Sequence, residues 1–271
     1  MAKYHSYGEQ LQVTVMLMLV RCVLLVVIIA VMVVAKERKN HLSFQAYSEY
    51  IVFRNSIATK IANANLTLLV PGVLNQAGDS VFATLLNKVP GDISEFGVYK
   101  GGGSIMMASV LFFLEPDTTR VVHMFDSFAG HPDYKASKEK DFDMQPYSGQ
   151  IIAPIEGVLA ALKEFGLIDR YNAKQIVLHK GWFKDTVPLL NRPLALIRAD
   201  GDAYTSTMDI LNNAYKLLSP RGVVIVDDYD DYQSCRNAIH DFFKEQNIPM
   251  EDLKFVNHKK LGMRPFWTKK V

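Results

Sequence analysis

Cysteine is scarce in this chain, and its scarcity excludes several classes of protein. The 271 residues include two cysteines, Cys22 and Cys235, which lie far apart in the sequence. A cysteine-based zinc site and a disulfide framework both need more cysteines at defined spacings, and the low number is consistent with a reducing compartment. The formal net charge of +2 is also small, which gives no indication of a surface for nucleic acid.

Apolar residues are abundant, at 49% against 21% charged residues. They are densest from Leu11 to Ala35, and a helix of that length can cross a hydrocarbon layer of roughly 30 Å. The segment therefore predicts a membrane anchor. A signal peptide is an alternative, although Lys36 and Glu37 follow in place of a small-residue cleavage site. A buried or self-associating hydrophobic helix is the other alternative.

The charges beside this segment predict its orientation. Lys36, Arg38 and Lys39 follow it, whereas Lys3 precedes it. The excess of basic residues behind the segment favours a cytoplasmic location for the rest of the chain. Without an anchor, the chain is expected in the cytoplasm.

The chain beyond residue 90 alternates short β-rich runs with longer helical runs. This alternation indicates parallel βαβ construction. The expected strands are 93–98, 121–125, 175–178, 194–199 and 223–226, followed by an antiparallel edge hairpin of 253–258 and 264–268. The expected helices include 44–64, one that ends near 114, 154–165, 207–218 and 232–245, with a turn over 219–222. We therefore expect an α/β fold with a doubly wound, mostly parallel, seven-stranded sheet over residues 91–271, after a helical region (41–90) and an N-terminal hydrophobic helix (1–40).

Acidic residues fall where the expected strands end. Ligands of an open α/β sheet bind beyond the carboxyl ends of its strands. Glu95 belongs to the first strand, and glycines from Gly97 to Gly103 follow it, so that the backbone can approach a ligand closely. Their spacing departs from the G-x-G-x-x-G of dinucleotide-binding proteins. A tight strand-to-helix turn with no ligand is therefore an equal alternative.

Two further features suit a ligand that contains adenosine. Asp126 ends the second strand, where a carboxylate can accept hydrogen bonds from ribose hydroxyls. The aromatic pair Trp182 and Phe183 follows Gly181 and can flank an adenine ring. The alternative for Asp126 is the cap of a turn, and the aromatic pair can equally belong to the core. The polar stretch from Ser127 to Gln150 has no apolar period, which favours a loop or lid over the site.

A metal site is predicted at the ends of the fourth and fifth strands. Asp200 and Asp202 follow one strand, and Asp227 and Asp228 follow the next. Gathered carboxylates repel one another unless a cation or a shared proton compensates them. Oxygen ligands of this kind select Mg²⁺, Ca²⁺ or Mn²⁺ over zinc. The alternative is an acidic rim exposed to solvent.

These segments together resemble the macrocin O-methyltransferase family of class I S-adenosylmethionine-dependent methyltransferases. The resemblance covers about residues 50 to 250 in one order, and its segments are Gly91 to Gly102 (GDISEFGVYKGG), Asp126 to Phe128 (DSF), Gly181 to Thr186 (GWFKDT), Asp200 to Asp209 (DGDAYTSTMD) and Val226 to Tyr229 (VDDY). Members of this family methylate sugar hydroxyls of macrolide antibiotics and related compounds. The resemblance implies a Rossmann-like sheet, S-adenosylmethionine and Mg²⁺ or another divalent cation.

The resemblance also implies the roles of individual residues. The cofactor would be bound by Glu95, Gly97, Val98, Tyr99, Gly101, Asp126, Ser127, Gly181, Trp182, Phe183 and Asp200. The metal ligands would be Asp200, Asp227 and Asp228, with Asp202 as a further candidate. Asp200 and Asp227 would be catalytic through the metal. The implied partner is a small-molecule hydroxyl acceptor, namely a sugar. Apart from the resemblance, we expect no nucleic acid as a partner and a membrane through residues 11–35, and a homo-oligomer stays open.

The sequence departs from the expected pattern in the general base. Catechol O-methyltransferases, which are more distant relatives, carry a lysine near the first metal aspartate, where this chain has Ala203. His131 is the nearest histidine in the polar stretch, and it does not replace that lysine in the sequence pattern. The identity of the general base therefore stays open. Two other functions remain as alternatives, namely a nucleotide-sugar oxidoreductase or epimerase on a Rossmann sheet, and a non-catalytic, membrane-tethered binding module.

Overall fold

The computed structural model describes residues 44–255 and 265–270. It divides into two compact units, Met1–Val52 and Phe53–Val271. The predicted membrane anchor, residues 11–35, lies outside the described residues, as does Cys22. Among the helices formed by the described residues, none has both the length and the apolar character that a membrane crossing requires. The predicted domain boundaries near residues 40 and 90 stay predictions.

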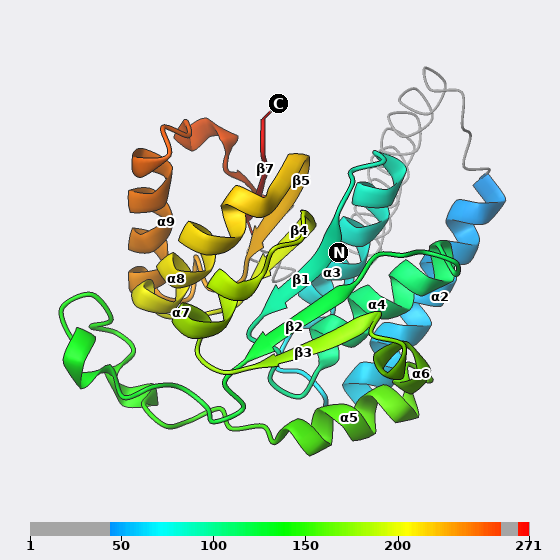
Figure 1. Cartoon of the computed structure of the whole chain (residues 1–271), viewed down its shortest axis with the longest axis horizontal. Coiled ribbons are helices and arrows are strands. Elements are labelled where there is room, and N and C mark those ends of the chain that lie inside the picture. Colours follow the sequence, from blue (N-terminus) through cyan, green and yellow to red (C-terminus); the bar gives the residue numbers. More distant parts are fainter. Residues whose placement is uncertain (1–43, 256–264, 271) are drawn as a thin grey trace, which may run out of the picture. The chain divides into compact units, whose positions relative to one another are not determined.

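The described part of the second unit is built on a seven-stranded sheet with the order β3-β2-β1-β4-β5-β7-β6 (Figure 1). Its strands are β1 Asp92–Phe96, β2 Val122–Asp126, β3 Ile176–Lys180, β4 Leu194–Ala199, β5 Leu218–Val226, β6 Lys254–Phe255 and β7 Pro265–Thr268. Strands β3, β2, β1, β4 and β5 are parallel, while β7 is antiparallel to both β5 and β6. The predicted mostly parallel sheet and its terminal antiparallel hairpin are thus confirmed.

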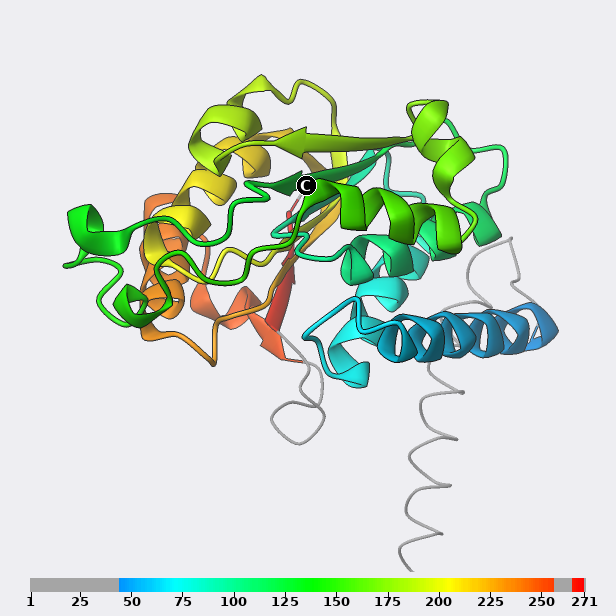
Figure 2. The ribbon, with the colours of Figure 1, turned by 90° about the horizontal axis from the view of Figure 1, so that it is seen from below.

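Helices cover both faces of this sheet (Figures 1 and 2). Helices α7, α8 and α9 lie on one face, and α3, α4 and α5 lie on the other. The α-helices of the described residues are α2 Phe44–Asn63, α3 Pro71–Leu86, α4 Gly102–Leu114, α5 Ile155–Glu164, α6 Ile168–Asn172, α7 Phe183–Thr186, α8 Tyr204–Ala214 and α9 Gln233–Glu245. Helix α4 is apolar around its whole circumference, as a helix packed between other elements must be, and Gly102 through Phe112 are all buried.

The largest difference from the prediction is in β5. The strand begins at Leu218, so the predicted turn over 219–222 lies inside it. Leu194 of β4 pairs with Leu218, whereas Leu196 pairs with Val223, and the register shift between the two pairs accommodates the extra residues of β5. The turn-forming residues therefore produce a bulge in a continuous strand rather than a separate connection.

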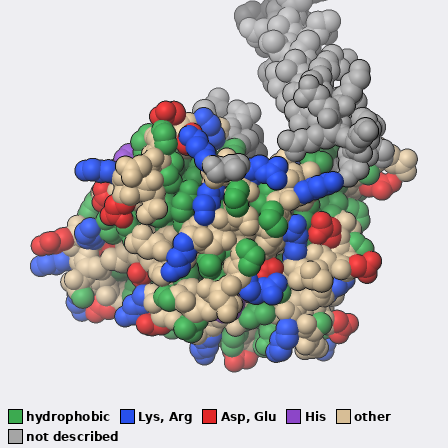
Figure 3. Space-filling model, turned by 45° about the horizontal axis from the view of Figure 1, so that its top comes forward, with side chains coloured by type: hydrophobic (Ala, Val, Ile, Leu, Met, Phe, Trp, Pro, Cys, Tyr) green, Lys and Arg blue, Asp and Glu red, His purple; other side chains and the backbone are tan. Residues whose placement is uncertain are grey.

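The segment between β2 and α5 is the predicted loop. It contains two short 3₁₀ helices, η1 Tyr134–Ser137 and η2 Gln145–Tyr147, and it extends beyond the arrowhead end of β2 (green in Figure 1). On the face drawn in Figure 3, basic and acidic side chains are interspersed among hydrophobic ones. The residues that the sequence predicts to bind a cofactor and a metal lie instead at the carboxyl ends of the strands.

Candidate active site

A cavity of about 720 Å³ opens where β1, β2, β4 and β5 end. Ten of the eleven predicted cofactor residues line it, namely Glu95, Gly97, Val98, Tyr99, Asp126, Ser127, Gly181, Trp182, Phe183 and Asp200. Gly101 does not line the cavity; it precedes α4 with a left-handed φ of 97°. The segment Thr67–Val70, which the sequence did not identify, contributes a further part of the wall.

Gly97 brings the end of β1 against the end of β4. Its φ is +94°, and a Cβ atom at this position would lie 1.9 Å from the carbonyl oxygen of Asp200. Any other residue would therefore collide with backbone. The glycine predicted from the first motif is required by this close approach between two strand ends.

Glu95 is a buried acid at the floor of the cavity. Gly103 leaves room for it, since a Cβ there would lie 2.0 Å from Oε1 of Glu95. The hydroxyl of Ser104 donates a hydrogen bond to the other carboxylate oxygen. Burial raises the pKa of Glu95 to about 7, although the guanidinium of Arg198 and the Ser104 hydroxyl act in the opposite direction.

The carboxylate of Asp126 accepts hydrogen bonds from three backbone N–H groups. Its Oδ2 accepts hydrogen bonds from the N–H groups of Val98 (2.8 Å) and Tyr99 (2.9 Å), and its Oδ1 accepts one from Phe128 (2.7 Å). A carboxylate has about four acceptor positions. Binding both hydroxyls of a ribose would therefore require one of these bonds to be shared or replaced.

The aromatic pair is split between two environments. Trp182 is 39% exposed and lines the cavity. Phe183 instead packs against the core and meets Phe96 edge to face at 6.1 Å between ring centroids. Trp182 is thus the ring that is available for a flat ligand group, while Phe183 also stabilises the fold.

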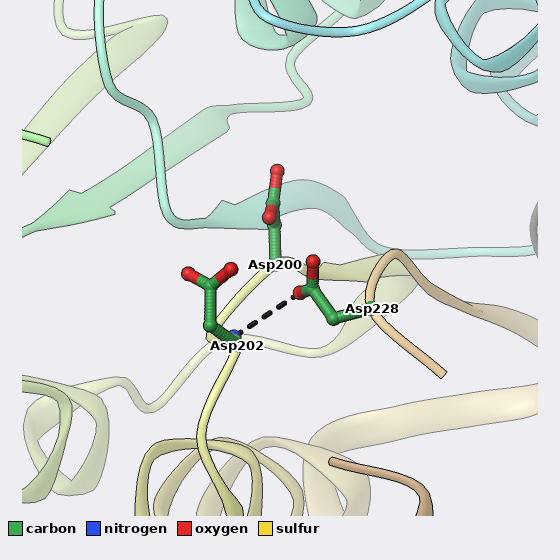
Figure 4. Close-up of side chains that lie close together, drawn as sticks. All are labelled: Asp200, Asp202 and Asp228. Atoms are coloured by element: carbon green, nitrogen blue, oxygen red, sulfur yellow. Dashed lines mark hydrogen bonds between the residues drawn. The ribbon is translucent and has the colours of Figure 1, made fainter. Parts of the chain in front are cut away.

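Three carboxylates converge at one side of the cavity (Figure 4). Asp200, Asp202 and Asp228 each place an oxygen within 4.8 Å of the others. The N–H of Asp202 donates to Oδ2 of Asp228 at 3.1 Å. Burial and the neighbouring acids raise the pKa of both Asp202 and Asp228. Three hard oxygen ligands with mutually unfavourable charges fit a divalent cation of the Mg²⁺ type.

Asp227, the third predicted metal ligand, lies beside this group rather than in it. Its Oδ1 accepts a hydrogen bond of 2.6 Å from Nη2 of Arg198. The geometric group therefore contains two of the three predicted ligands, together with Asp202, which was the further candidate. The assignment of Asp227 to the metal stays a prediction.

The predicted loop contributes a histidine to the cavity. Nε2 of His131 lies 3.5 Å from Oδ2 of Asp202, and its Nδ1 lies 3.0 Å from the hydroxyl of Tyr134. Burial lowers the pKa of His131 below 6.5, although the nearby Asp126 opposes this shift. The imidazole of His131 therefore lies beside the acid cluster, and burial favours its neutral form.

Two aspartates of the loop fix it to the N-termini of α8 and α9. The carboxylate of Asp141 is fully buried and accepts hydrogen bonds from the N–H (3.0 Å) and hydroxyl (2.7 Å) of Thr205. Asp143 accepts one from the N–H of Ser234 at 3.0 Å. The residues that precede the two helices, Ala203 and Tyr232, supply no side-chain cap of their own. The loop therefore caps both helices.

A family model described as macrocin-O-methyltransferase matches residues 28–264. The chain is 42% identical over 166 residues to the 8-demethyl-8-(2,3-dimethoxy-alpha-L-rhamnosyl)-tetracenomycin-C 4'-O-methyltransferase of Streptomyces olivaceus, which is 60% of this chain and 61% of that relative. It therefore spans less than two thirds of that relative's length. It is 35% identical over 184 residues to the mycinamicin III 3''-O-methyltransferase of Micromonospora griseorubida, which is 66% of this chain and 70% of that relative.

A solved structure supports the same relationship. The structure of the O-methyltransferase NovP aligns with a TM-score of 0.65 and 30% identity, over 73% of this chain and 79% of that one. The calicheamicin methyltransferase CalS11 aligns with a TM-score of 0.60 at 22% identity, which shows the shared fold. The order of the motifs, the sheet that carries them and the extent of the family match agree, and the chain belongs to the macrocin O-methyltransferase family.

Proposed function

We propose that the chain is an S-adenosylmethionine-dependent O-methyltransferase that acts on a sugar hydroxyl of a glycosylated natural product, with Mg²⁺ or another divalent cation. The observation that carries this proposal is the cavity in which the glycine-rich end of β1 and the acid cluster face one space. The relatives' names agree with it, because they describe O-methyltransferases of rhamnosyl-tetracenomycin and mycinamicin.

The cofactor residues divide by chemistry. Glu95 and the backbone of Gly97–Tyr99 would bind the methionine end, Asp126 the ribose, and Trp182 one face of the adenine. S-adenosylmethionine supplies an electrophilic methyl group, and a divalent cation supplies Lewis acidity that makes a hydroxyl easier to deprotonate. The protein's own contribution is to align the acceptor oxygen with the methyl group in a direct displacement and to exclude water with the loop.

Asp200, Asp202 and Asp228 would hold the cation, together with Asp227, which the family resemblance implies as a ligand. His131 is our candidate for the proton acceptor. If its Nδ1–H donates to the hydroxyl of Tyr134 at 3.0 Å, its Nε2 carries no proton and faces Oδ2 of Asp202 at 3.5 Å on the cavity side, where it would accept the proton of the acceptor hydroxyl. Burial lowers its pKa, which favours the neutral form that a base requires.

The decisive experiment is transfer of a labelled methyl group from S-adenosylmethionine to a panel of rhamnosylated polyketides and macrolides, with Mg²⁺ or with a chelator. We expect metal-dependent incorporation into a sugar hydroxyl. Binding of S-adenosylhomocysteine without any transfer would instead favour the non-catalytic binding module. Affinity for NAD in place of S-adenosylhomocysteine would favour the oxidoreductase, which the family assignment does not support.

We propose separately that residues 11–35 attach the chain to a membrane. The support is the apolar composition of this run and the basic residues behind it. Full-length protein should sediment with membranes and resist alkaline extraction, and replacing Leu24 and Leu25 by arginine should release it. Recovery of the unchanged chain in the supernatant would disprove the attachment.

A further inference from the structure

Arg198 is a buried cation in the centre of the acid group. It belongs to β4, directly opposite Glu95 of β1 in the parallel register, and is 1% exposed. Its Nη1 donates to Oε1 of Glu95 (2.8 Å) and to Oδ2 of Asp200 (2.7 Å). Its Nη2 donates to Oδ1 of Asp227 at 2.6 Å. One side chain thus joins acids from the ends of three neighbouring strands.

The three partners of Arg198 have different predicted roles. Glu95 is assigned to the methionine end of the cofactor, whereas Asp200 and Asp227 are assigned to the metal. Asp200 is also part of the cluster with Asp202 and Asp228, so it is shared between the guanidinium and the proposed cation site. Any movement of Arg198 would therefore reach both halves of the cavity.

Arginine suits this position better than lysine. A guanidinium is planar and presents its donors in a fixed fork, so that it orients several carboxylates at once. An ammonium is a compact point charge on a flexible stem, with no comparable directional constraint. The partners of Arg198 approach two nitrogens of one plane from three strands, which is an arrangement that depends on the fork.

We propose that Arg198 is a positioning residue, which holds Glu95, Asp200 and Asp227 in the geometry that the cofactor and the divalent cation require. The proposal deepens the proposed function and rests on it. Mutation of residues that orient metal ligands typically weakens metal binding by roughly 10- to 100-fold. A residue that acted through its charge alone would have a different signature, because a cation beside the site repels a second cation.

The test compares two variants of the full-length chain by calorimetric titration with Mn²⁺ in the presence of S-adenosylhomocysteine. Arg198→Lys keeps the charge and removes the fork, and we expect its Mn²⁺ affinity to fall by roughly tenfold or more. Arg198→Gln removes the charge as well, and we expect weaker binding there too. Arg192→Lys is the matched control: Arg192 pairs with Asp92 at the opposite end of β1, and its Mn²⁺ affinity should equal that of the unchanged protein.

Each remaining outcome has a defined meaning. Unchanged affinity in Arg198→Lys, or tighter binding in Arg198→Gln, would show that charge rather than geometry matters and would overturn the proposal. Failure of both variants to fold, judged by circular dichroism, would assign Arg198 to sheet stability and would overturn it as well. If the unchanged protein itself binds no Mn²⁺, the proposed metal-dependent function fails first, and this result is distinct from a failure confined to the variants.

Discussion

Replacing Asp141 by alanine should release the loop between β2 and α5 from the N-terminus of α8. The buried carboxylate accepts two hydrogen bonds from Thr205, at 3.0 and 2.7 Å. A hydrogen bond to a charged group contributes about 1.5 kcal/mol at the lower end of its range, so the two together contribute about 3 kcal/mol. Since 1.4 kcal/mol corresponds to a factor of ten, the population of the undocked loop should rise roughly 100-fold.

Limited trypsin digestion measures this population. The side chains of Lys135 and Lys138 are exposed, but the two residues lie within and directly after η1, so we expect cleavage there to need local opening of the backbone. Cleavage mapped by mass spectrometry should accelerate roughly 100-fold at these two lysines. Asp143→Ala is the matched control. Among the described residues, Asp143 accepts a single backbone hydrogen bond, from Ser234, and its other carboxylate oxygen is buried with no hydrogen-bond partner there, so acceleration in this variant should be tenfold or less. Equal rates for both variants, or no acceleration in Asp141→Ala, would refute capping as the means by which the loop is held.

Four further predictions concern the site and the sheet. Asp228→Asn should abolish calorimetric Mn²⁺ binding while S-adenosylhomocysteine still binds; retained Mn²⁺ binding would remove Asp228 from the ligand set. His131→Asn should lower kcat by roughly 100-fold with unchanged cofactor affinity, and full activity would exclude it as the base. Trp182→Ala should weaken S-adenosylhomocysteine binding by about 1 to 3 kcal/mol if the ring stacks on adenine, and no change would show that it does not. Burial and the neighbouring His123 lower the pKa of His179 from 6.5 to about 4. The stability that its neutral form contributes is therefore complete above about pH 6.5 and is lost as the pH falls toward 4, by up to about 3 kcal/mol. In His179→Gln the midpoint of thermal unfolding should depend less on pH over that range.

Local pattern was sufficient for those elements whose own residues determine them. Strand β4 was predicted to its exact bounds, Leu194–Ala199, because its apolar run ends at an acidic residue. Strand β5 was predicted short because Pro220 and Gly222 are typical of turns. Pairing with β4 nevertheless extends across them, since the neighbouring strand supplies hydrogen bonds on both sides of the bulge. That information belongs to the partner strand and is absent from the local sequence.

The loop residues show the same limit at the site. Asp141 is one of several acids in a polar stretch, and nothing near it in the sequence indicates that it is fully buried or that it caps a helix 64 residues away. Arg198 does carry a local signal. It is the charged residue of an otherwise apolar strand, and a buried charge must be paired.

The acids themselves show what a motif can and cannot specify. Asp227 and Asp228 are adjacent in the sequence and follow β5 directly, where the strand ends in a turn. Asp227 contacts Arg198, while Asp228 contacts the backbone of Asp202. For both to ligate one cation, as the family resemblance implies, the carboxylate of Asp227 would have to bind it with the oxygen that does not accept from Nη2 of Arg198, or else leave that bond. The position of Arg198 therefore decides how far Asp227 can take part, which is why the metal set and the guanidinium must be tested together.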